Sequence, residues 1–271
     1  MSSSRVILHE GFRLELSILP LSLVRPHEEV VPAAVADLAS TMSSAGVQRD
    51  PIIADSATHV ILDGMHRSNA LKRLGAKSAL VCEVDYAEER VLLGRWLRSV
   101  KVHGGLSGLL PKGLGMEEGR DRDGAMGLVD DGEAQAALLS GGRGFLPKRI
   151  GPAGPWDTVR ALDGFAASFG CPLRVIGEEE VAGALGAGES VLYVRPPTKR
   201  DVLRAGETGP LLPPKSTRHS MPARPAGLPL PLSWLMAEWG RQERLEEFMK
   251  ARSPRLVPSG RKHDGAVYLF T

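Results

Sequence analysis

The sequence has few cysteines, few aromatic residues and little net charge. Its 271 residues include two cysteines, Cys82 and Cys171, which can form neither a CxxC pair nor a zinc site. The net charge of +2 is too balanced to indicate a general nucleic-acid-binding protein. Aromatic residues make up 5% of the chain, whereas 31 glycines and 20 prolines indicate many loops around a modest core.

Long hydrophobic runs and targeting signals are also missing. No stretch reaches the length of a membrane span, and the first ten residues lack the layout of a signal peptide. No glycine-rich loop precedes a Lys-Ser/Thr pair, which excludes an ordinary P-loop kinase. No Gly-x-Ser-x-Gly elbow is present either. We therefore expect a cytoplasmic globular protein that has reduced cysteines and no membrane partner.

Hydrophobic periodicity predicts a first α/β domain over residues 1–100. Apolar and polar residues alternate over 12–18, which is typical of a strand with one buried face. A helix is expected from Pro32 to Gly46, because proline favours the first turn and glycine favours the end. The remaining elements expected here are strands at 51–54, 59–62 and 79–84 and helices at 68–74 and 88–100.

Beyond residue 100 the pattern is less regular. Glycines and charges over 101–132 predict a linker or a mobile lid. Residues 133–271 are expected to form a second α/β lobe that ends in a helix from Pro231 to about Arg252. The other elements expected in this lobe are helices at 156–169 and 198–205 and strands at 174–176 and 190–194.

The segment from Val60 to Arg67 carries the strongest chemical signal. Three apolar residues predict a buried strand, Asp63 and Gly64 follow it, and His66 and Arg67 stand where a helix begins. Backbone N–H groups at a helix start attract anions, and the two basic side chains add to that field. An acid beside such a site indicates chemistry on a phosphorylated ligand. The alternative is an ordinary strand-to-helix junction in which Asp63 caps the helix.

Other polar segments are further candidates. Glu28 is suited to act as a general base if it faces a ligand, and is otherwise an acid at a helix start. A run of hydrogen-bonding and cationic side chains suits phosphate, because arginine binds it with two hydrogen bonds. The alternative for this run is a solvated loop. Its members are Lys215, Ser216, Thr217, Arg218 and His219. Trp96 is suited to stack on a ligand, although tryptophan is more often a core residue.

The order of these motifs resembles the ParB/sulfiredoxin superfamily. The motifs are Pro26-His27-Glu28, Pro51-Ile52-Ile53, Asp63-Gly64-Met65-His66-Arg67 and Leu71-Lys72-Arg73-Leu74-Gly75. The segments Pro197-Thr198-Lys199 and Pro214 to His219 resemble, instead, the free serine kinases of archaea. The resemblance spans about residues 12–225. It implies an α/β (α+β) fold with a ParB/sulfiredoxin-like N-terminal domain and a second α/β lobe that closes over the active site.

The resemblance implies phosphoryl transfer from ADP or ATP to the hydroxyl of free L-serine, with Mg²⁺. The product would be O-phospho-L-serine, a precursor for cysteine biosynthesis. Glu28 would be the catalytic base, and Asp63 a second catalytic acid near the phosphate and the metal. Gly64, His66 and Arg67 would hold the donor phosphates. The substrate side would comprise Trp96, Lys215, Ser216, Thr217, Arg218 and His219. The implied partners are a nucleotide and an amino acid, with no nucleic acid.

Two departures from the family pattern leave the acceptor open. Met65 replaces the first of two signature histidines, and Pro32-Ala33-Ala34 lacks the acid with which the family recognises serine. L-threonine or another small hydroxyl compound is therefore an alternative acceptor. Two further alternatives are a ParB-like nucleotide-dependent DNA-binding protein, which requires a helix-turn-helix after residue 100, and a nucleotide sensor without catalysis. A sulfiredoxin-like reductase requires a cysteine where Met65 stands, so that reading is set aside.

Overall fold

The computed structural model describes residues 5–103, 106–148, 154–237, 241–258 and 265–270. The chain is a mixed α/β protein whose described residues form two compact units, each with its own hydrophobic core. The first unit comprises residues 1–93, 198–214 and 219–271, and the second comprises residues 94–197 and 215–218. Across the described ranges, no helix is long and apolar enough to cross a membrane.

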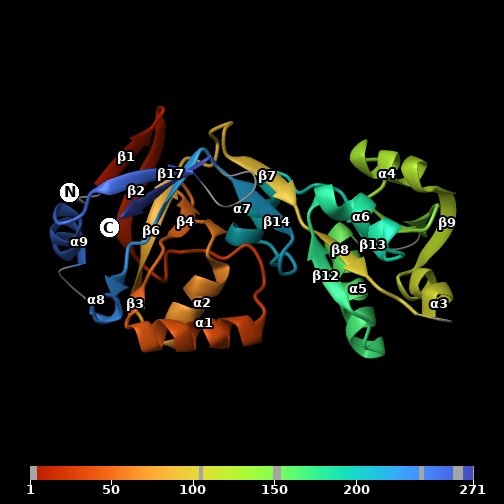
Figure 1. Ribbon diagram of the computed structural model, residues 1–271, viewed down its shortest axis with the longest axis horizontal. Helices are drawn as coiled ribbons and strands as arrows, with labels where there is room; N and C mark the ends of the chain where they lie inside the picture. Colours follow the sequence, from red (N-terminus) through yellow and green to blue (C-terminus); the bar gives the residue numbers. More distant parts are fainter. Residues whose placement is uncertain (1–4, 104–105, 149–153, 238–240, 259–264, 271) are drawn as a thin grey trace. The chain divides into compact units, whose positions relative to one another are not determined.

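A five-stranded sheet forms the centre of the first unit (Figure 1). Its strands, in spatial order, are β1 (Arg5–His9), β2 (Phe12–Pro20), β6 (Ser78–Val84), β4 (Ile52–Asp55) and β5 (Ile61–Asp63). Strand β2 pairs antiparallel with β1 and β6, whereas β4 pairs parallel with β6. The strand expected from the alternation over 12–18 is confirmed, because Phe12, Leu14 and Leu16 are buried while Arg13 is exposed.

Helices and smaller sheets complete the first unit. The helices are α1 (Pro32–Ala45), α2 (Met65–Arg73), α7 (Lys199–Glu207), α8 (Leu232–Met236) and α9 (Arg241–Lys250). The small sheets contain β3 (Val47–Gln48) with β16 (Leu230–Pro231), and β15 (Ala223–Ala226) with β18 (Ala266–Phe270) and β17 (Pro254–Pro258). Helix α1 packs against α2 and ends at Gly46, whose φ of 68° is left-handed, as the sequence predicted.

A six-stranded sheet forms the centre of the second unit (Figure 1). Its strands, in spatial order, are β12 (Leu173–Ile176), β8 (Leu97–Val100), β13 (Ser190–Val194), β10 (Ala136–Ser140), β11 (Arg143–Pro147) and β9 (Met116–Asp121). The helical segments are α3 (Leu106–Gly113), α4 (Arg122–Asp130), α5 (Pro155–Phe169), the 3₁₀ turn η1 (Glu178–Glu180) and α6 (Val181–Gly186). The helix expected at 156–169 and the strands at 174–176 and 190–194 are confirmed.

The helix expected over 88–100 is wrong. The segment forms β7 (Leu92–Arg95), which pairs with β14 (Thr217–Ser220), and then β8 (Leu97–Val100). All four residues of β8 are buried, and the strand lies between β12 and β13 inside the sheet. A strand that is covered on both faces has no period-two alternation, so periodicity alone does not distinguish it from a buried helix.

The expected linker and domain limits also differ from the structure. Residues 101–132 contain α3, β9 and α4 rather than a structureless lid, while 104 and 105 lie outside the described residues. The second unit begins at residue 94 rather than 133, and much of 198–271 belongs to the first unit. The many glycines of this segment predicted a linker, but Gly115 and Gly132 lie in turns between regular elements, with φ of 65° and 77°.

The C-terminal helix was expected to be continuous from Pro231 to about Arg252. The structure has two helices there, α8 and α9, and residues 238–240 between them lie outside the described part of the chain. Helix α8 contacts β6 and α9 contacts β2, so both cover the central sheet of the first unit. The end of the chain therefore contributes to the same core as its beginning.

Candidate functional site

The turn between β5 and α2 places an acid next to the start of a helix. Asp63 is the last residue of β5, and Gly64 precedes α2 with φ 108° and ψ 25°. A Cβ atom on Gly64 would lie 3.0 Å from Nη2 of Arg67. Position 64 therefore requires glycine for two reasons: its φ is positive, and a side chain would meet the Arg67 guanidinium.

The start of α2 is suited to an anion. Among the described residues, no side chain caps this helix, whose first N–H groups have no partner within the helix. Arg67 donates from Nη2 to the Pro51 carbonyl across 3.1 Å, and its buried Nε has no hydrogen-bond partner in the described part of the chain. His66 accepts a hydrogen bond at Nε2 from the Val31 N–H across 3.4 Å. The helix field and these side chains favour a phosphate at this position.

Asp63 is held by two arginines. Its Oδ2 lies 3.6 Å from Nη2 of Arg67 and accepts a 2.8 Å hydrogen bond from Nη1 of Arg224 on β15. Nη2 of Arg224 donates to the His219 carbonyl across 3.1 Å. Arg224 is 7% exposed, so a buried guanidinium joins the acid of the turn to the segment that contains His219. Sequence reasoning missed Arg224, since no spacing relates it to Asp63.

Glu28 lies in a segment that pairs with the proline-rich stretch. The Glu29 N–H donates to the Leu212 carbonyl across 2.8 Å, and the Leu212 N–H donates to the His27 carbonyl across 2.9 Å. Glu28 is 7% exposed, and its Oε1 lies 3.7 Å from Nε2 of His27. His27 also hydrogen-bonds the carbonyl of Ile61 in β5 through Nδ1. The backbone therefore fixes Glu28 beside the strand that ends in Asp63.

His219 connects these groups. Its ring lies 5.6 Å from that of His27 in an edge-to-face arrangement, and its Nε2 is 2.8 Å from the Tyr86 hydroxyl. Burial lowers the pKa of His219 well below its ordinary value, and His27 lowers it further, so His219 is neutral at pH 7. Burial also raises the pKa of Tyr86. Glu28, Asp63 and His219 thus belong to one network within the first unit.

The segment Pro197-Thr198-Lys199 supports this network through Lys199. Lys199, at the first position of α7, donates from Nζ to the carbonyls of Tyr86 and Glu88 across 2.7 and 2.9 Å. Burial lowers the pKa of Lys199. Thr198 caps α7 and forms a capping box with Asp201, which fixes the start of the helix. Tyr86 and the role of Lys199 as its support were not predicted from the sequence.

The other predicted residues lie in the second unit. Arg218 stacks on the Trp96 indole, with Cζ 4.5 Å from the ring centroid, and pairs with Glu179 across 3.2 Å. Lys215 has a positive φ of 57°, and its carbonyl accepts a 2.9 Å hydrogen bond from Nη1 of Arg98. Ser216 and Thr217 are buried. The predicted run 215–219 is thus divided, with 215–218 in the second unit and His219 in the first.

The comparisons with known proteins point in one direction. No protein-family model matches the chain. It is 28% identical over 232 residues to an ATP-dependent L-serine kinase of Staphylothermus marinus, covering 82% of this chain and 92% of the relative. It is 26% identical over 222 residues to an ADP-dependent L-serine kinase of Thermococcus kodakarensis, covering 79% and 90%. A variant of free serine kinase in complex with AMP superimposes with a TM-score of 0.71 at 25% identity, covering 81% and 93%. The chain is a distant homologue of the ATP- and ADP-dependent L-serine kinases.

Proposed function

We propose that this protein is a kinase that transfers a phosphoryl group from ADP or ATP to the hydroxyl of free L-serine. The product is O-phospho-L-serine, which suits a supply of precursor for cysteine biosynthesis. The observation that carries the proposal is the connected set of Glu28, Asp63 and His219 beside an uncapped helix start. Phosphoryl transfer needs a carboxylate that takes the proton of the acceptor hydroxyl and a binding site for the donor phosphates.

The donor phosphates are assigned to the start of α2. There the backbone N–H groups, His66 and the guanidinium of Arg67 supply hydrogen bonds and positive charge, and Gly64 leaves room for that guanidinium. The buried Nε of Arg67 lacks a partner among the described residues, and a phosphate oxygen is a suitable acceptor for it. The similarity to relatives that use ATP or ADP supports a nucleotide as the ligand.

Glu28 is assigned as the general base. The residue is 7% exposed, and its carboxylate stands beside His27, which the Ile61 carbonyl orients. A carboxylate held in this way accepts the hydroxyl proton as the bond to phosphorus forms. As the serine oxygen bonds to the terminal phosphorus, the bond from that phosphorus to the bridging oxygen of the donor breaks, and AMP or ADP leaves with the electron pair. The guanidinium of Arg67 is placed to balance the charge on the phosphates.

Asp63 is assigned as the second acid, and Arg224 as its positioning residue. The 2.8 Å hydrogen bond from Arg224 restricts the carboxylate to one orientation, and the bond to the His219 carbonyl fixes the guanidinium itself. An arginine that makes two such bonds loses less conformational freedom per bond than a lysine does. Arg224 is therefore proposed to act through Asp63 rather than on the substrate.

A magnesium ion fits Asp63 if most of its ligands are waters and the phosphates of the nucleotide. Among the described residues, no group of three or more His, Cys, Asp or Glu side chains is arranged to hold a metal ion. Mg²⁺ commonly takes one or two carboxylates, several waters and the phosphates of its nucleotide. Asp63 is the carboxylate proposed to supply a ligand. When bound, Mg²⁺ neutralises phosphate charge, and the protein residues position the reactants.

The acceptor is assigned to Trp96 and to the run from Lys215 to His219, as the resemblance implies. This run comprises Lys215, Ser216, Thr217, Arg218 and His219. The stacking of Arg218 on Trp96 supports the assignment, since the indole fixes the plane of the guanidinium and arginine N–H groups are suited to a carboxylate or a phosphate. L-threonine remains the alternative acceptor, because α1 begins with Pro32-Ala33-Ala34 and carries no acid in its first turn.

The architecture disfavours a DNA-binding function. A ParB-like protein of that kind requires two adjacent short helices after residue 100. Directly after residue 100, β9 separates α3 from α4, and the consecutive helices α8 and α9 further along the chain pack on the central sheet of the first unit. The ParB/sulfiredoxin-like assignment is therefore proposed for the nucleotide-binding unit alone.

Incubation with L-serine, Mg²⁺ and either ADP or ATP, followed by detection of phosphoserine, tests the proposal. L-threonine and inositol serve as parallel acceptors. We expect Glu28→Gln to lower turnover by about two orders of magnitude or more, the usual contribution of a positioned base. Glu89→Gln, at an exposed position of the same unit, is the matched control. Absence of product with every acceptor, or full turnover in the Glu28 variant, would contradict the assignment.

A further inference from the structure

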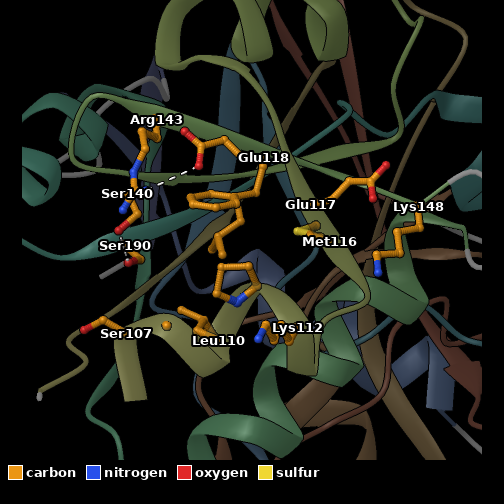
Figure 2. Close-up of a pocket in the computed structure, with 14 residues that line it drawn as sticks. Ser107, Leu110, Lys112, Met116, Glu117, Glu118, Ser140, Arg143, Lys148 and Ser190 are labelled. Carbon is orange, nitrogen blue, oxygen red and sulfur yellow. Dashed lines mark hydrogen bonds and ion pairs between the residues drawn. The ribbon is translucent and has the colours of Figure 1, made fainter. Parts of the chain in front are cut away.

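The second unit contains a cavity that has no part in the proposed kinase site. Its volume is about 400 Å³, and its walls come from α3, β9, β10, β11 and the first residue of β13 (Figure 2). This volume lies in the range of small-molecule sites. None of the residues assigned to donor, acceptor or catalysis lines it.

The centre of the cavity is apolar. Leu110, Met116, Leu138 and Phe145 line it, and all four are buried. These side chains come from α3 and from three neighbouring strands of the sheet, so the helix and the sheet enclose the space between them. An apolar portion of a ligand gains free energy by leaving water for such a surface.

Polar groups stand on opposite sides of this apolar centre. Ser140, Ser190 and Arg143 lie on one side in Figure 2, and Lys148 lies on the other. The Ser190 hydroxyl hydrogen-bonds that of Ser140 across 2.9 Å, and Arg143 pairs with Glu118 across 3.3 Å. The charge of Arg143 is therefore already compensated, and the hydroxyl pair is available to a neutral polar group.

Two lysines leave positive charge at the cavity. Lys112 and Lys148 both line it and are exposed, and neither forms an ion pair within the ranges that the structure describes. Glu117 is the remaining acid of the lining and likewise forms no ion pair there. A carboxylate placed at the lysines gains charge-assisted hydrogen bonds from ammonium groups that otherwise face only water.

We propose that this cavity binds a small organic anion with an apolar body, of the class of aryl or alkyl carboxylates. The carboxylate lies at Lys112 and Lys148, and the apolar body packs against Leu138 and Phe145. The inference does not depend on the proposed kinase reaction, because the cavity lies wholly within the second unit.

A titration with 3-phenylpropionate, followed by ligand-observed NMR, tests the proposal on the full chain. The amide 3-phenylpropionamide has the same shape without the charge. We expect saturable binding of the carboxylate and about tenfold weaker binding of the amide, since two exposed charge contacts add little more than this. The double variant K112Q/K148Q is expected to bind the carboxylate about tenfold less tightly and the amide as before.

A second pair of variants tests the cavity itself. Gly108 lines the cavity on α3, and a Cβ there would meet no atom within 4 Å, so Gly108→Leu is expected to fold and to obstruct the space. Gly127→Leu makes the same change on α4, at a position equally free of neighbours and outside the lining. K101Q/R120Q removes the same charge elsewhere in the unit.

The outcomes are distinct. Loss of carboxylate binding in Gly108→Leu, with binding retained in Gly127→Leu and K101Q/R120Q, would support the site. Equal affinity for the carboxylate and the amide would overturn the anionic class of ligand. Absence of saturable binding, or binding unaffected by Gly108→Leu, would overturn the site itself. Serine phosphorylation by these variants is a separate readout, so failure of this proposal and failure of the kinase proposal are distinguishable.

Discussion

Asp63 accepts a 2.8 Å hydrogen bond from Arg224, a residue 161 positions further along the chain. The acid ends β5 and the arginine lies on β15, so the contact joins two different sheets of the first unit. Arg224 also donates to the His219 carbonyl. This one guanidinium therefore connects the turn before α2 with the end of the motif at 215–219.

Replacement of Arg224 by lysine should lower kcat while leaving the KM for the nucleotide nearly unchanged. Lysine keeps the charge but does not make both hydrogen bonds, so Asp63 loses its fixed orientation. We expect kcat to fall about tenfold, the loss of roughly one charge-assisted hydrogen bond. Arg90→Lys, which alters an exposed pair with Glu88, is the control in steady-state kinetics. An equal fall in both variants would contradict a positioning role.

Gly64→Ala should weaken nucleotide binding in addition to destabilising the fold. The residue has φ 108°, and a Cβ would lie 3.0 Å from the Arg67 guanidinium, which must then move. We expect the free energy of unfolding to fall by about 1–2 kcal/mol because of the positive φ. Gly75→Ala is the matched control, since Gly75 has φ 80° but no neighbour within 4 Å of the added atom.

The comparison of these glycine variants separates strain from displacement. Both should lower the unfolding midpoint in urea, whereas only Gly64→Ala should raise the Kd for ADP in a calorimetric titration. An unchanged Kd in Gly64→Ala would show that Arg67 does not take part in donor binding.

His219 should make the stability of the protein depend on pH. Burial, followed by the charge of His27, lowers its pKa in the folded state below the ordinary value of 6.5. The unfolded chain therefore binds a proton at this residue more readily than the folded chain does. The contribution of His219 to folded-state stability is complete above pH 6.5 and is lost as the pH falls below that value. The loss should approach about 1.4 kcal/mol for each pH unit.

Urea unfolding between pH 5 and pH 8 measures this effect. The slope below pH 6.5 should be shallower in His219→Gln than in the parent protein, while His103→Gln, at an exposed position, should leave it unchanged. His27, Asp63, Arg224 and Tyr86 surround His219, so the comparison is made as a difference between variants. Identical slopes in all three proteins would count against a buried neutral His219.

Arg218→Met should raise the KM for the acceptor amino acid. The guanidinium stacks on Trp96 and pairs with Glu179, and the variant removes its charge and hydrogen bonds. We expect a rise of about tenfold or more, as for the loss of one charge-assisted contact. Arg174→Met removes the 3.1 Å pair with Glu189 in the same unit and is the control. A KM for serine that is the same in both variants would remove Arg218 from the acceptor site.

Local patterns predicted the elements that local physics controls. Strand β2 follows from alternation, and α1 follows from a proline start and a glycine end. The helix expected over 88–100 was wrong because all four residues of β8 are buried although two of them, Arg98 and Ser99, are polar, so no alternation marks the strand. Arg224 and Tyr86 escaped notice because nothing in their sequence neighbourhood relates them to Asp63 or His219.

The amino-acid sequence by itself determined the turn from β5 into α2, since Gly64 permits the positive φ and the following residues form the helix start. Only the tertiary structure decided which groups meet there. It brought Arg224 to Asp63, His219 to Tyr86, and residues 198–214 and 219–271 back to the first unit. The physical reason is that helix and turn preferences act over a few residues, whereas these contacts depend on burying a shared core.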